Sequence, residues 1–335
     1  MPGKPTKTRV EAAYAAAFSA LTPDAVIAAI EAAFDMRCTS MVRPLTSYIN
    51  RVYDVALDDG SHVIAKFYRP GRWSRDALQD ELDFLAELHA DEVPVVPPLP
   101  GRDGSLLHKW EDAWFAVFPR KGGRALEEPT ATEWRQIGRL VARLHAVGAR
   151  RTPRDRIHLH PRKATAAQLD YILKSGTVAR DLADEYQHAV SGMIEKVAPL
   201  FDGVEAIRIH CDLHFGNILY RPDEGYHLLD FDDMAVGPAV QDMWLILPDR
   251  LARARTEMEH LLEGYETFMD FPRETMRLIE PLRAMRFIHF TAWCARQKAD
   301  GGFSRLASDW GTREFWRQQI ADLATQMQEI KDAAG

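Results

Sequence analysis

The sequence predicts an α+β chain in two parts, with an antiparallel sheet and one accompanying helix first and mostly helices afterwards. Three observations support this class. Segments that alternate apolar and polar residues, separated by turn signals, lie between residues 51 and 118. Beyond residue 130, apolar residues recur at helical spacing. A proline- and glycine-bearing stretch divides the two patterns, so we expect an N-terminal lobe of residues 1–119 and a C-terminal lobe of residues 120–335.

Composition excludes several classes of protein. Of the 335 residues, 46% are apolar, which is enough for substantial cores. A formal net charge of -7 does not suit a nucleic-acid-binding surface. The three cysteines, Cys38, Cys211 and Cys294, are too few and too scattered for a disulfide framework, which favours a reducing, cytoplasmic setting. Residues 1–9 are basic but lead into an alanine-rich pattern instead of a signal core, and no apolar run reaches membrane-spanning length.

The elements of the first part follow in order. Thr22 precedes Pro23 and Asp24 as a cap, which predicts a helix to about Phe34. Strands are expected near Met41 and at 51–57, 61–68, 106–110 and 113–118, with turns at 44–50 and 58–60. A helix is expected at 75–89 and a proline-rich surface crossing at 94–101.

The second part carries helical patterns throughout. Apolar residues at helical spacing predict a helix around 134–144, with Thr132 as its cap. Further helices are expected at 168–173, 184–197, 238–247, 258–268 and 281–296, and from about residue 313. The aromatic residues of this part are most simply core.

One stretch carries a recognisable chemical pattern. From His210 the chain has His-x-Asp-x-x-x-x-Asn, with Asp212 and Asn217 in the last two positions, and a short apolar strand then ends at Asp230. That is the spacing of a kinase catalytic loop and its metal-binding aspartate. Asp212 would accept the proton of an attacking hydroxyl, Asn217 and Asp230 would be oxygen ligands of Mg²⁺, and His210 would position the backbone. Two alternatives are a transition-metal cluster, whose usual spacing is absent, and a solvated acidic turn.

A second pattern places a lysine opposite a glutamate. Lys66 ends the apolar run from Val63, where kinases carry the lysine that contacts nucleotide phosphates. Glu81 lies inside the apolar stripe of the helix at 75–89, whereas Asp80 lies outside it. A buried carboxylate needs a cation, so we expect Lys66 to meet Glu81. Otherwise Lys66 points to solvent and Glu81 extends to the helix edge.

Two further segments receive roles from their positions. Residues 118–121, including Phe118 and Arg120, lie at the expected lobe boundary, where kinases recognise adenine through backbone groups; the alternative is a plain loop. Asp242 follows the acidic turn and could accept hydrogen bonds from the backbone of the catalytic loop. It could equally be a helix N-terminal acid. His145 is more simply a packing or surface histidine than a catalytic one.

Together these segments resemble the aminoglycoside phosphotransferase and choline kinase group of protein-kinase-like enzymes, and within it the stress response kinase A family. The resemblance spans most of residues 40 to 250. It includes residues 45–53, 66–73, 91–95, 115–119 and 210–219, as well as Gly-Pro-Ala-Val-Gln-Asp at 237–242. The catalytic-loop motif is shared with the wider superfamily, whereas Lys-Phe-Tyr-Arg-Pro from residue 66 and the 237–242 segment are specific to that branch.

The resemblance implies a two-lobed, bacterial, cytoplasmic serine/threonine protein kinase with a role in stress, using ATP between its lobes. It implies Asp212 as proton acceptor, Asn217 and Asp230 as Mg²⁺ ligands, and an ATP contact at Ser47. No glycine-rich loop is present, so the Ser47 hydroxyl and nearby amides would hold phosphates. Asp232 stands where the metal motif of protein kinases has glycine, which argues against an in/out switching segment.

Two alternatives to a protein kinase stay open. One is a small-molecule kinase that phosphorylates an aminoglycoside, choline or a similar alcohol. The other is a pseudokinase, although the complete set of Lys66, Glu81, Asp212, Asn217 and Asp230 argues against it. We expect a monomer whose partner is a hydroxyl acceptor, with neither nucleic acid nor membrane involved.

Overall fold

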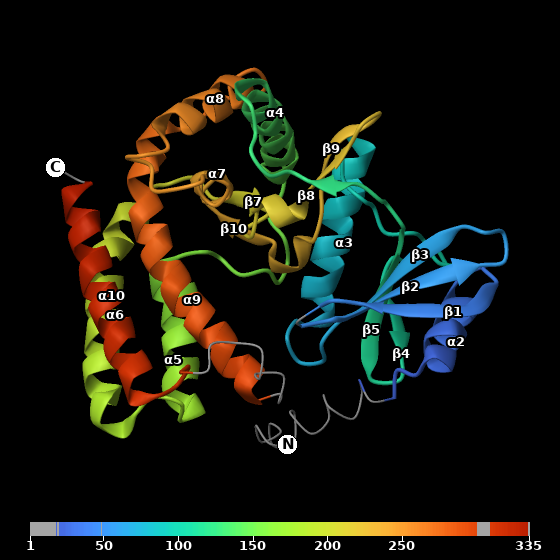
Figure 1. Cartoon of the computed structure of the whole chain (residues 1–335), viewed down its shortest axis with the longest axis horizontal. Coiled ribbons are helices and arrows are strands. Elements are labelled where there is room, and N and C mark those ends of the chain that lie inside the picture. Colours follow the sequence, from blue (N-terminus) through green and yellow to red (C-terminus); the bar gives the residue numbers. More distant parts are fainter. Residues whose placement is uncertain (1–17, 19, 48, 300–308, 334–335) are drawn as a thin grey trace. The chain divides into compact units, whose positions relative to one another are not determined.

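The computed structural model describes residue 18 and residues 20–47, 49–299 and 309–333 (Figure 1). The described residues form two compact units, and each unit combines separate stretches of the chain. Unit 1 contains the residues up to Thr130 together with residues 153–156 and 214–234, and unit 2 contains residues 131–152, 157–213 and those from Ala235 onward. The basic residues 1–9 lie outside the described part, and the lobe boundary at residue 119 stays a prediction.

Unit 1 is built on a five-stranded antiparallel sheet in the order β1-β2-β3-β5-β4. Its strands are β1 (Cys38–Leu45), β2 (Arg51–Leu57), β3 (His62–Phe67), β4 (His108–Trp110) and β5 (Ala113–Pro119). The strands predicted from alternation are thus confirmed to within two residues at each end. The turn expected from residue 44 begins later, because β1 continues through Leu45.

The β2–β3 turn shows why this sequence makes a hairpin here. Gly60 has a φ of +82°, which is the left-handed conformation that glycine adopts without strain. The carboxylate of Asp59 accepts the backbone N–H of Ser61 at 2.9 Å and its hydroxyl at 2.6 Å. Local chemistry therefore closes the turn, and the register it sets pairs Val52 with Lys66.

Two α-helices among the described residues belong to unit 1. α2 (Pro23–Ala33) begins where the Thr22 hydroxyl accepts the N–H of Ala25 at 3.2 Å, which confirms the predicted cap. α2 packs with β1, and its buried residues join the core of the sheet (Figure 1). α3 (Arg75–Ala90) begins at Ser74, whose hydroxyl accepts the N–H of Ala77 at 3.0 Å.

One prediction about α3 is wrong. Asp80, expected outside the inward stripe, is buried. Its carboxylate accepts the backbone N–H groups of Arg154 and Asp155, each at 2.8 Å. These bonds satisfy the buried charge, so α3 turns a wider face inward than its apolar residues alone predict.

A second sheet in unit 1 contains strands far apart in sequence. It has the order β6-β8-β9 and comprises β6 (Arg124–Ala125), β8 (Ile218–Arg221) and β9 (Gly225–Leu228). Val95 forms a parallel bridge with Leu228 and is buried. The proline-rich segment at 94–101 therefore packs against this hairpin in part and is not purely a surface crossing, because its strand-like backbone finds partners there.

Unit 2 is mainly helical. Its long helices are α4 (Ala131–Gly148), α5 (Ala166–Ser175), α6 (Ala183–Val197), α8 (Arg255–Tyr265), α9 (Ile279–Ala299) and α10 (Arg313–Asp332). Two antiparallel strands, β7 (Ile207–Ile209) and β10 (Ala235–Gly237), and the five-residue helix α7 (Val240–Trp244) accompany them. The predicted helices are present, although Thr132 lies inside α4 instead of capping it and the helix expected at 238–247 is shorter.

The helices of unit 2 pack around a large aromatic residue in one place and against small glycines in another. α5, α6, α9 and α10 lie side by side around a shared core that includes the fully buried Trp316 (Figure 1). α4 and α8 approach closely enough for backbone contact. A Cβ added at Gly138 would lie 2.0 Å from the carbonyl oxygen of Leu261, and one at Gly264 would lie 2.0 Å from that of Arg135. Glycine is therefore required on both helices.

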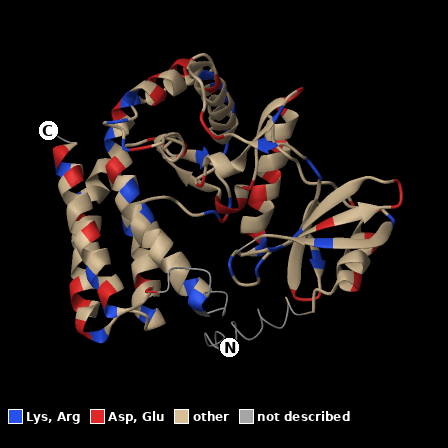
Figure 2. Cartoon of the chain, in the orientation of Figure 1, with Lys and Arg blue, Asp and Glu red and all other residues tan. Residues whose placement is uncertain are grey.

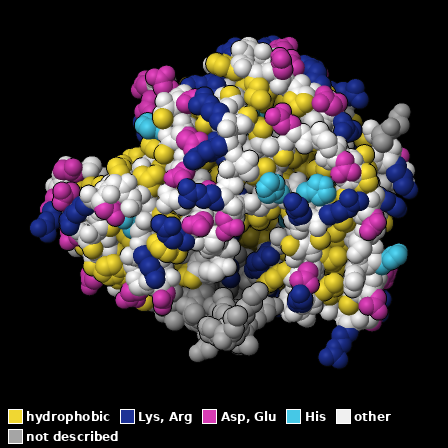
Figure 3. All heavy atoms as spheres, turned by 180° about the vertical axis from the view of Figure 1, so that it is seen from behind, with side chains coloured by type: hydrophobic (Ala, Val, Ile, Leu, Met, Phe, Trp, Pro, Cys, Tyr) yellow, Lys and Arg dark blue, Asp and Glu magenta, His cyan; other side chains and the backbone are white. Residues whose placement is uncertain are grey.

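None of the helices that the structure describes has the length and hydropathy needed to cross a bilayer. On the face drawn in Figure 3, Lys and Arg side chains are interspersed with Asp and Glu. Cys38, Cys211 and Cys294 form no disulfide bond.

Candidate active site

Lys66 of β3 lies among carboxylates in unit 1. Its Nζ is 3.2 Å from Oε1 of Glu81 and 3.2 Å from Oδ1 of Asp230, and it is 3.5 Å from Oδ1 of Asp232. The central position of β3, between β2 and β5, fixes the backbone that carries this amine. The predicted pairing of Lys66 with Glu81 is thus confirmed in geometry, and the lysine does not point freely to solvent.

Glu81 is almost completely buried, with 1% of its side chain exposed. Besides Lys66 it accepts a hydrogen bond from the hydroxyl of Tyr68 at 3.3 Å and one from Nη2 of Arg156 at 3.1 Å. A lone buried carboxylate is costly, so two cations and a phenol are what allow this glutamate to face inward. The alternative in which Glu81 extends to the helix edge is excluded.

The segment from Asp230 is bent sharply. Asp230 has a φ of +56°, and its side chain is 59% exposed beside Lys66. Phe231 is buried and packs edge-to-face on Phe84 of α3, with ring centroids 5.9 Å apart. The buried phenyl ring anchors the bend, so Asp230 presents its carboxylate next to the lysine amine.

Asp232, which stands where glycine would be expected, is buried and ion-paired. Arg72 contacts the carboxylates of both Asp232 and Asp233. Burial alone would raise the pKa of Asp232, but Lys66, Arg72 and Arg156 outweigh it and lower that pKa to about 2. Asp232 is therefore ionised at neutral pH.

The charge state of Lys66 follows from the same cluster. Burial acts to lower its pKa, yet Asp232, Glu81 and Asp230 outweigh burial and raise the pKa well above its ordinary value. The amine therefore remains a cation throughout the physiological range.

Asn217 and Asp230 lie at the same end of the β8–β9 hairpin. Ile218 pairs with Leu228, and the N–H of Leu229 donates to the carbonyl of Asn217 at 2.9 Å. Asn217 directly precedes one strand, and Asp230 follows the residue bonded to it. The hairpin register thus brings the two predicted metal ligands together although they are 13 positions apart in the sequence.

The loop that carries Asp212 belongs to unit 2 and is held by α7. Cys211 has a φ of +72°. The two carboxylate oxygens of Asp242 accept the N–H groups of His210 and Cys211, each at 2.7 Å, and Gln241 donates to the carbonyl of Cys211 at 3.0 Å. The hypothesis that Asp242 holds the loop backbone is confirmed, and these bonds stabilise the left-handed residue just before Asp212.

His145 lies within hydrogen-bond distance of the Asp242 carboxylate. It is fully buried in α4, with Nε2 3.1 Å from Oδ2 of Asp242 and Nδ1 3.0 Å from the hydroxyl of Tyr265. The interpretation of His145 as a packing residue is confirmed. Its contacts orient the aspartate that holds the loop.

Three arginines that contact the predicted site residues were not themselves predicted from the sequence. Arg72 and Arg156 join the carboxylate cluster of unit 1, and in unit 2 Nη2 of Arg286 donates to Oδ1 of Asp212 at 2.9 Å. Arg286 follows Met285 within an apolar helical pattern, so the argument that flagged Glu81 could have flagged it. Arg156 lies in a short loop with no periodicity and could not have been found that way.

The remaining predicted residues lie in unit 1. Ser47 is half-buried in the link between β1 and β2. Phe118 of β5 is half-buried and packs against the cluster around Tyr68 and Leu82. Arg120 follows β5, and its Nε lies 3.2 Å from Oδ2 of Asp54. Their nucleotide contacts stay predictions.

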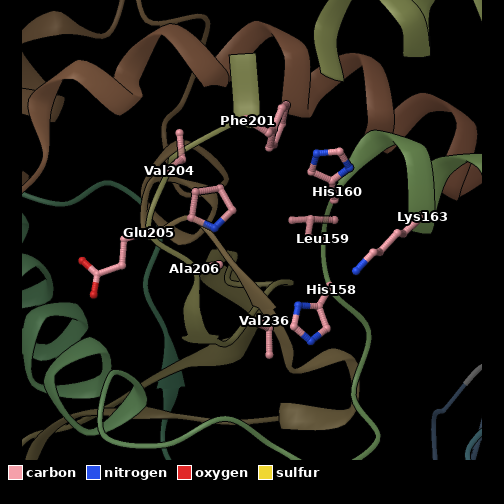
Figure 4. A pocket seen from close by; sticks show the side chains of 10 residues that line it. His158, Leu159, His160, Lys163, Phe201, Val204, Glu205, Ala206 and Val236 are labelled. Atoms are coloured by element: carbon pink, nitrogen blue, oxygen red, sulfur yellow. The ribbon is translucent and has the colours of Figure 1, made fainter. Parts of the chain in front are cut away.

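The linings of two cavities include none of the carboxylates of the candidate active site. One, of about 280 Å³, is in unit 2 and is lined by residues among 158–163, 201–206 and 236–238. Figure 4 shows His160 beside Phe201, with His158 and Lys163 nearby. The other, of about 670 Å³, is in unit 1 and includes Arg120 and residues 59–63. Apart from Arg120, neither cavity contains a predicted site residue.

The fold is that of protein-kinase-like phosphotransferases, and the predicted α+β class is confirmed. The chain belongs to the phosphotransferase enzyme family, whose model matches residues 42–279. It is similar to stress response kinase A of Escherichia coli (strain K12), with 34% identity over 325 residues that cover 94% of this chain and 95% of the relative. It is similarly related to the serine/threonine protein kinase RdoA of Salmonella typhimurium, with 34% identity over 321 residues, 92% of this chain and 93% of that one.

Solved structures agree on the fold. The amicoumacin kinase hAmiN, in complex with AMP-PNP, Ca²⁺ and Ami, aligns with a TM-score of 0.71 at 19% identity and covers 98% of this chain and 96% of its own. The microcompartment-associated aminopropanol kinase aligns with a TM-score of 0.64 at 20% identity, over 88% of this chain and 93% of that one. The family model and the relatives at 34% identity confirm the resemblance to the stress response kinase A family, and the chain is a phosphotransferase of the kinase type.

Proposed function

We propose that this phosphotransferase uses ATP and Mg²⁺ to phosphorylate serine or threonine hydroxyl groups of proteins. The observation that carries the proposal is the position of the Lys66 amine, 3.2 Å from both the Glu81 and the Asp230 carboxylates. A relative at 34% identity is named a serine/threonine protein kinase, which supports a protein acceptor. The name of the Escherichia coli relative supports a role in stress, and three cysteines without a disulfide bond support a cytoplasmic location.

The residues present fit a nucleotide with a divalent ion. Asn217 and Asp230 supply the hard oxygen ligands that Mg²⁺ prefers. Among the described residues no group of three or more His, Cys, Asp or Glu could hold a metal by itself, which suits an ion that takes its remaining ligands from phosphates and water. When bound, that ion supplies charge neutralisation for the transferred phosphoryl group. Lys66, fixed by Glu81, adds a permanent positive charge for the phosphate oxygens.

Asp212 performs the proton chemistry in this proposal. Its carboxylate orients the acceptor hydroxyl and accepts its proton. The hydroxyl oxygen then bonds to the γ-phosphorus, while the bond between that phosphorus and the bridging oxygen of ADP breaks. Asp242 keeps the backbone before Asp212 in its left-handed bend, so the carboxylate is positioned before the acceptor arrives.

Three residues complete the proposed nucleotide site. The Ser47 hydroxyl would contact phosphate, because the link between β1 and β2 has no glycine-rich loop. Phe118 and Arg120 mark the chain that would meet adenine through backbone groups. The guanidinium of Arg120 is engaged by Asp54, so its side chain is not the contact we propose.

The test follows labelled phosphate from ATP. Purified protein would be incubated with Mg²⁺ and γ-labelled ATP, first with a general protein substrate and then with choline and 1-amino-2-propanol. We expect label on serine and threonine of the protein. Asp212→Asn should abolish transfer while ATP affinity persists, whereas Asp223→Asn, a change of the same type on an exposed turn, should leave transfer intact. Label that reaches only the small alcohols would overturn the protein acceptor.

A further inference from the structure

The proposed base has a cationic neighbour that the proposed reaction does not require. Arg286 of α9 donates through Nη2 to Asp212, and the two side chains are 42% and 30% exposed. A guanidinium has five N–H donors. Within the described part of the chain, Asp212 is the one carboxylate recorded within ion-pair distance of Arg286. The arginine therefore retains donors for a second anion at the point where the acceptor hydroxyl must lie.

An aromatic surface continues from Arg286 along the same helix face. Phe290 and Trp293 follow at positions i+4 and i+7, which lie above one another on a helix. Phe290 is 57% exposed, and its ring stacks on Trp293 with centroids 5.6 Å apart and planes 16° apart. We call Arg286, Phe290 and Trp293 the α9 strip. Trp293 is half-buried and also packs against the cluster of Cys294, Ala295 and Trp310, so it supports the exposed ring of Phe290 from below. An exposed aromatic ring held in this way, next to a proposed catalytic residue, is a typical binding surface.

The charge of α9 selects the kind of partner. The helix carries Arg283, Arg286, Arg296 and Lys298 against the acid Glu280, and Figure 2 shows the positive bands along it. Arg283 lies 3.3 Å from Glu280, and Arg296 donates to Gln168 at 2.6 Å. Arg286 is the cation of this helix that meets the proposed base. Next to Arg286, an acceptor carboxylate is favoured over an ammonium group, because the guanidinium offers N–H donors and no acceptor.

We propose that the α9 strip binds the acceptor polypeptide as an extended segment, with an acidic residue beside the phosphorylated serine or threonine and an apolar residue further along. Helical rise places Phe290 about 6 Å and Trp293 about 10 Å beyond Arg286. An extended chain covers about 3.3 Å per residue, so the apolar side chain falls roughly two to three positions from the acidic one. The inference deepens the proposed function, because it assigns the acceptor class to the site at Asp212.

The same strip disfavours small amino alcohols. Their ammonium group would have to lie close to the hydroxyl that Asp212 orients, and therefore close to the Arg286 guanidinium. Like charges at such a distance lower affinity. The strip thus provides negative selection against cationic acceptors and positive selection for acidic segments.

The test measures binding, so that it is independent of catalysis. A short fluorescein-labelled peptide would carry alanine at the acceptor position, glutamate beside it and leucine three positions from the alanine. Two matched peptides would replace the glutamate by lysine or the leucine by glycine. Fluorescence anisotropy with the full chain should show at least about tenfold tighter binding of the glutamate peptide than of the lysine peptide.

Substitutions of Arg286 and Phe290 test the charged part and the aromatic part of the α9 strip individually. Arg286→Glu should reverse the preference between the glutamate and lysine peptides, and Arg286→Gln should remove it. Phe290→Ala should cancel the advantage of leucine over glycine and leave the charge preference. Lys196→Glu, the same charge change on an exposed turn of α6, is the control and should change neither preference.

The outcomes distinguish this inference from the proposed function. If Arg286→Glu leaves the peptide order unchanged while its thermal unfolding matches that of the unmodified chain, the α9 strip is not the acceptor surface. Equal binding of all three peptides by the unmodified chain would overturn it as well. If the preferences appear as expected but no phosphate reaches the serine version of the peptide, the strip stands and the protein-kinase activity fails.

Discussion

Arg156 and Glu81 form an ion pair in which Nη2 and Oε2 are 3.1 Å apart and neither side chain is more than 1% exposed. Arg156 also donates to the carbonyl oxygens of Ala77 and Asp232, at 2.8 and 2.7 Å. One buried guanidinium therefore bonds the first turns of α3 and the segment that carries Asp230. Glu81, which pairs with the proposed phosphate-binding Lys66, is therefore itself held in place by Arg156.

Replacing Arg156 by leucine should destabilise unit 1 strongly. The change leaves Glu81 without one of its cations and removes a donor from the carbonyl oxygens of Ala77, Asp232 and Met234. Breaking a buried pair in this way costs about 3–5 kcal/mol. Urea unfolding followed by tryptophan fluorescence measures it. Arg37→Leu is the control, because Arg37 is 81% exposed and lies 4.0 Å from Glu31. Equal effects of the two substitutions would contradict the structural role of Arg156.

Asp242→Asn should slow transfer without weakening nucleotide binding. The carboxylate accepts the N–H groups of His210 and Cys211 and lies within hydrogen-bond distance of His145, whereas an amide has one accepting oxygen. We expect kcat with a protein substrate to fall about 10- to 100-fold, because Asp212 loses its fixed position. ATP affinity from calorimetry should stay the same. The exposed Asp270→Asn is the control, and unchanged kcat in Asp242→Asn would disprove this role.

Acid should destabilise the protein through Asp232. Its folded pKa of about 2 lies below the ordinary aspartate value of about 3.9, so its contribution is present above pH 4 and is lost as the pH falls from about 4 to about 2. The shift corresponds to on the order of 2 kcal/mol. Unfolding free energies measured across this range should fall less steeply in Asp232→Asn than in the unmodified chain. Parallel pH curves would contradict the assignment.

Two glycine-to-alanine changes should have opposite signs. At Gly138 the new Cβ would meet the Leu261 carbonyl oxygen at 2.0 Å, so the close α4–α8 contact must open, at a cost of about 1–3 kcal/mol. At Gly192 of α6 nothing lies within 4 Å, so alanine should stabilise by about 0.5–1 kcal/mol through helix propensity. Urea unfolding measures both. A stabilising Gly138→Ala would show that the helices do not touch there.

ATP should bind weakly without a divalent cation. The cluster around the Lys66 amine holds four carboxylates and three cations, and it therefore retains one negative charge: Glu81, Asp230, Asp232 and Asp233 against Lys66, Arg72 and Arg156. Free ATP is repelled by that charge. Calorimetry with a chelator should show weaker binding than with Mg²⁺, and Asp230→Asn should bind metal-free ATP about tenfold more tightly than the unmodified chain. Equal ATP affinities for the unmodified chain with Mg²⁺, the unmodified chain with chelator and Asp230→Asn with chelator would contradict the proposed repulsion.

Much of the fold could be predicted because its signals are local. The strands at β2 and β3, the turn at Gly60 and the cap at Thr22 each depend on residues within a few positions of one another. Asp80 was misplaced because its partners are backbone N–H groups 74 and 75 positions away, which no helical pattern can indicate.

The residues of the candidate site differ in the same way: some carry a local signal in the sequence, and others have partners that only the fold reveals. Glu81 could be found because a charge inside an apolar stripe demands a partner, and Asp242 because of its place after the acidic turn. Arg156 pairs with a residue 75 positions away from a loop without periodicity, so only the folded chain shows it. Arg286 carried a usable signal, but its partner Asp212 lies 74 positions earlier.

The buried guanidinium of Arg156 also links the movement of α3 to that of the segment that carries Asp230. α3 and the Asp230 segment are connected by Arg156 and by the packing of Phe231 on Phe84, so a movement of one relative to the other has to break these contacts. Moving α3 alone would separate Arg156 from Glu81 or from the Asp232 carbonyl and would leave a buried charge without its partner. The ion pair therefore favours a rigid arrangement of α3 and the segment that carries Asp230.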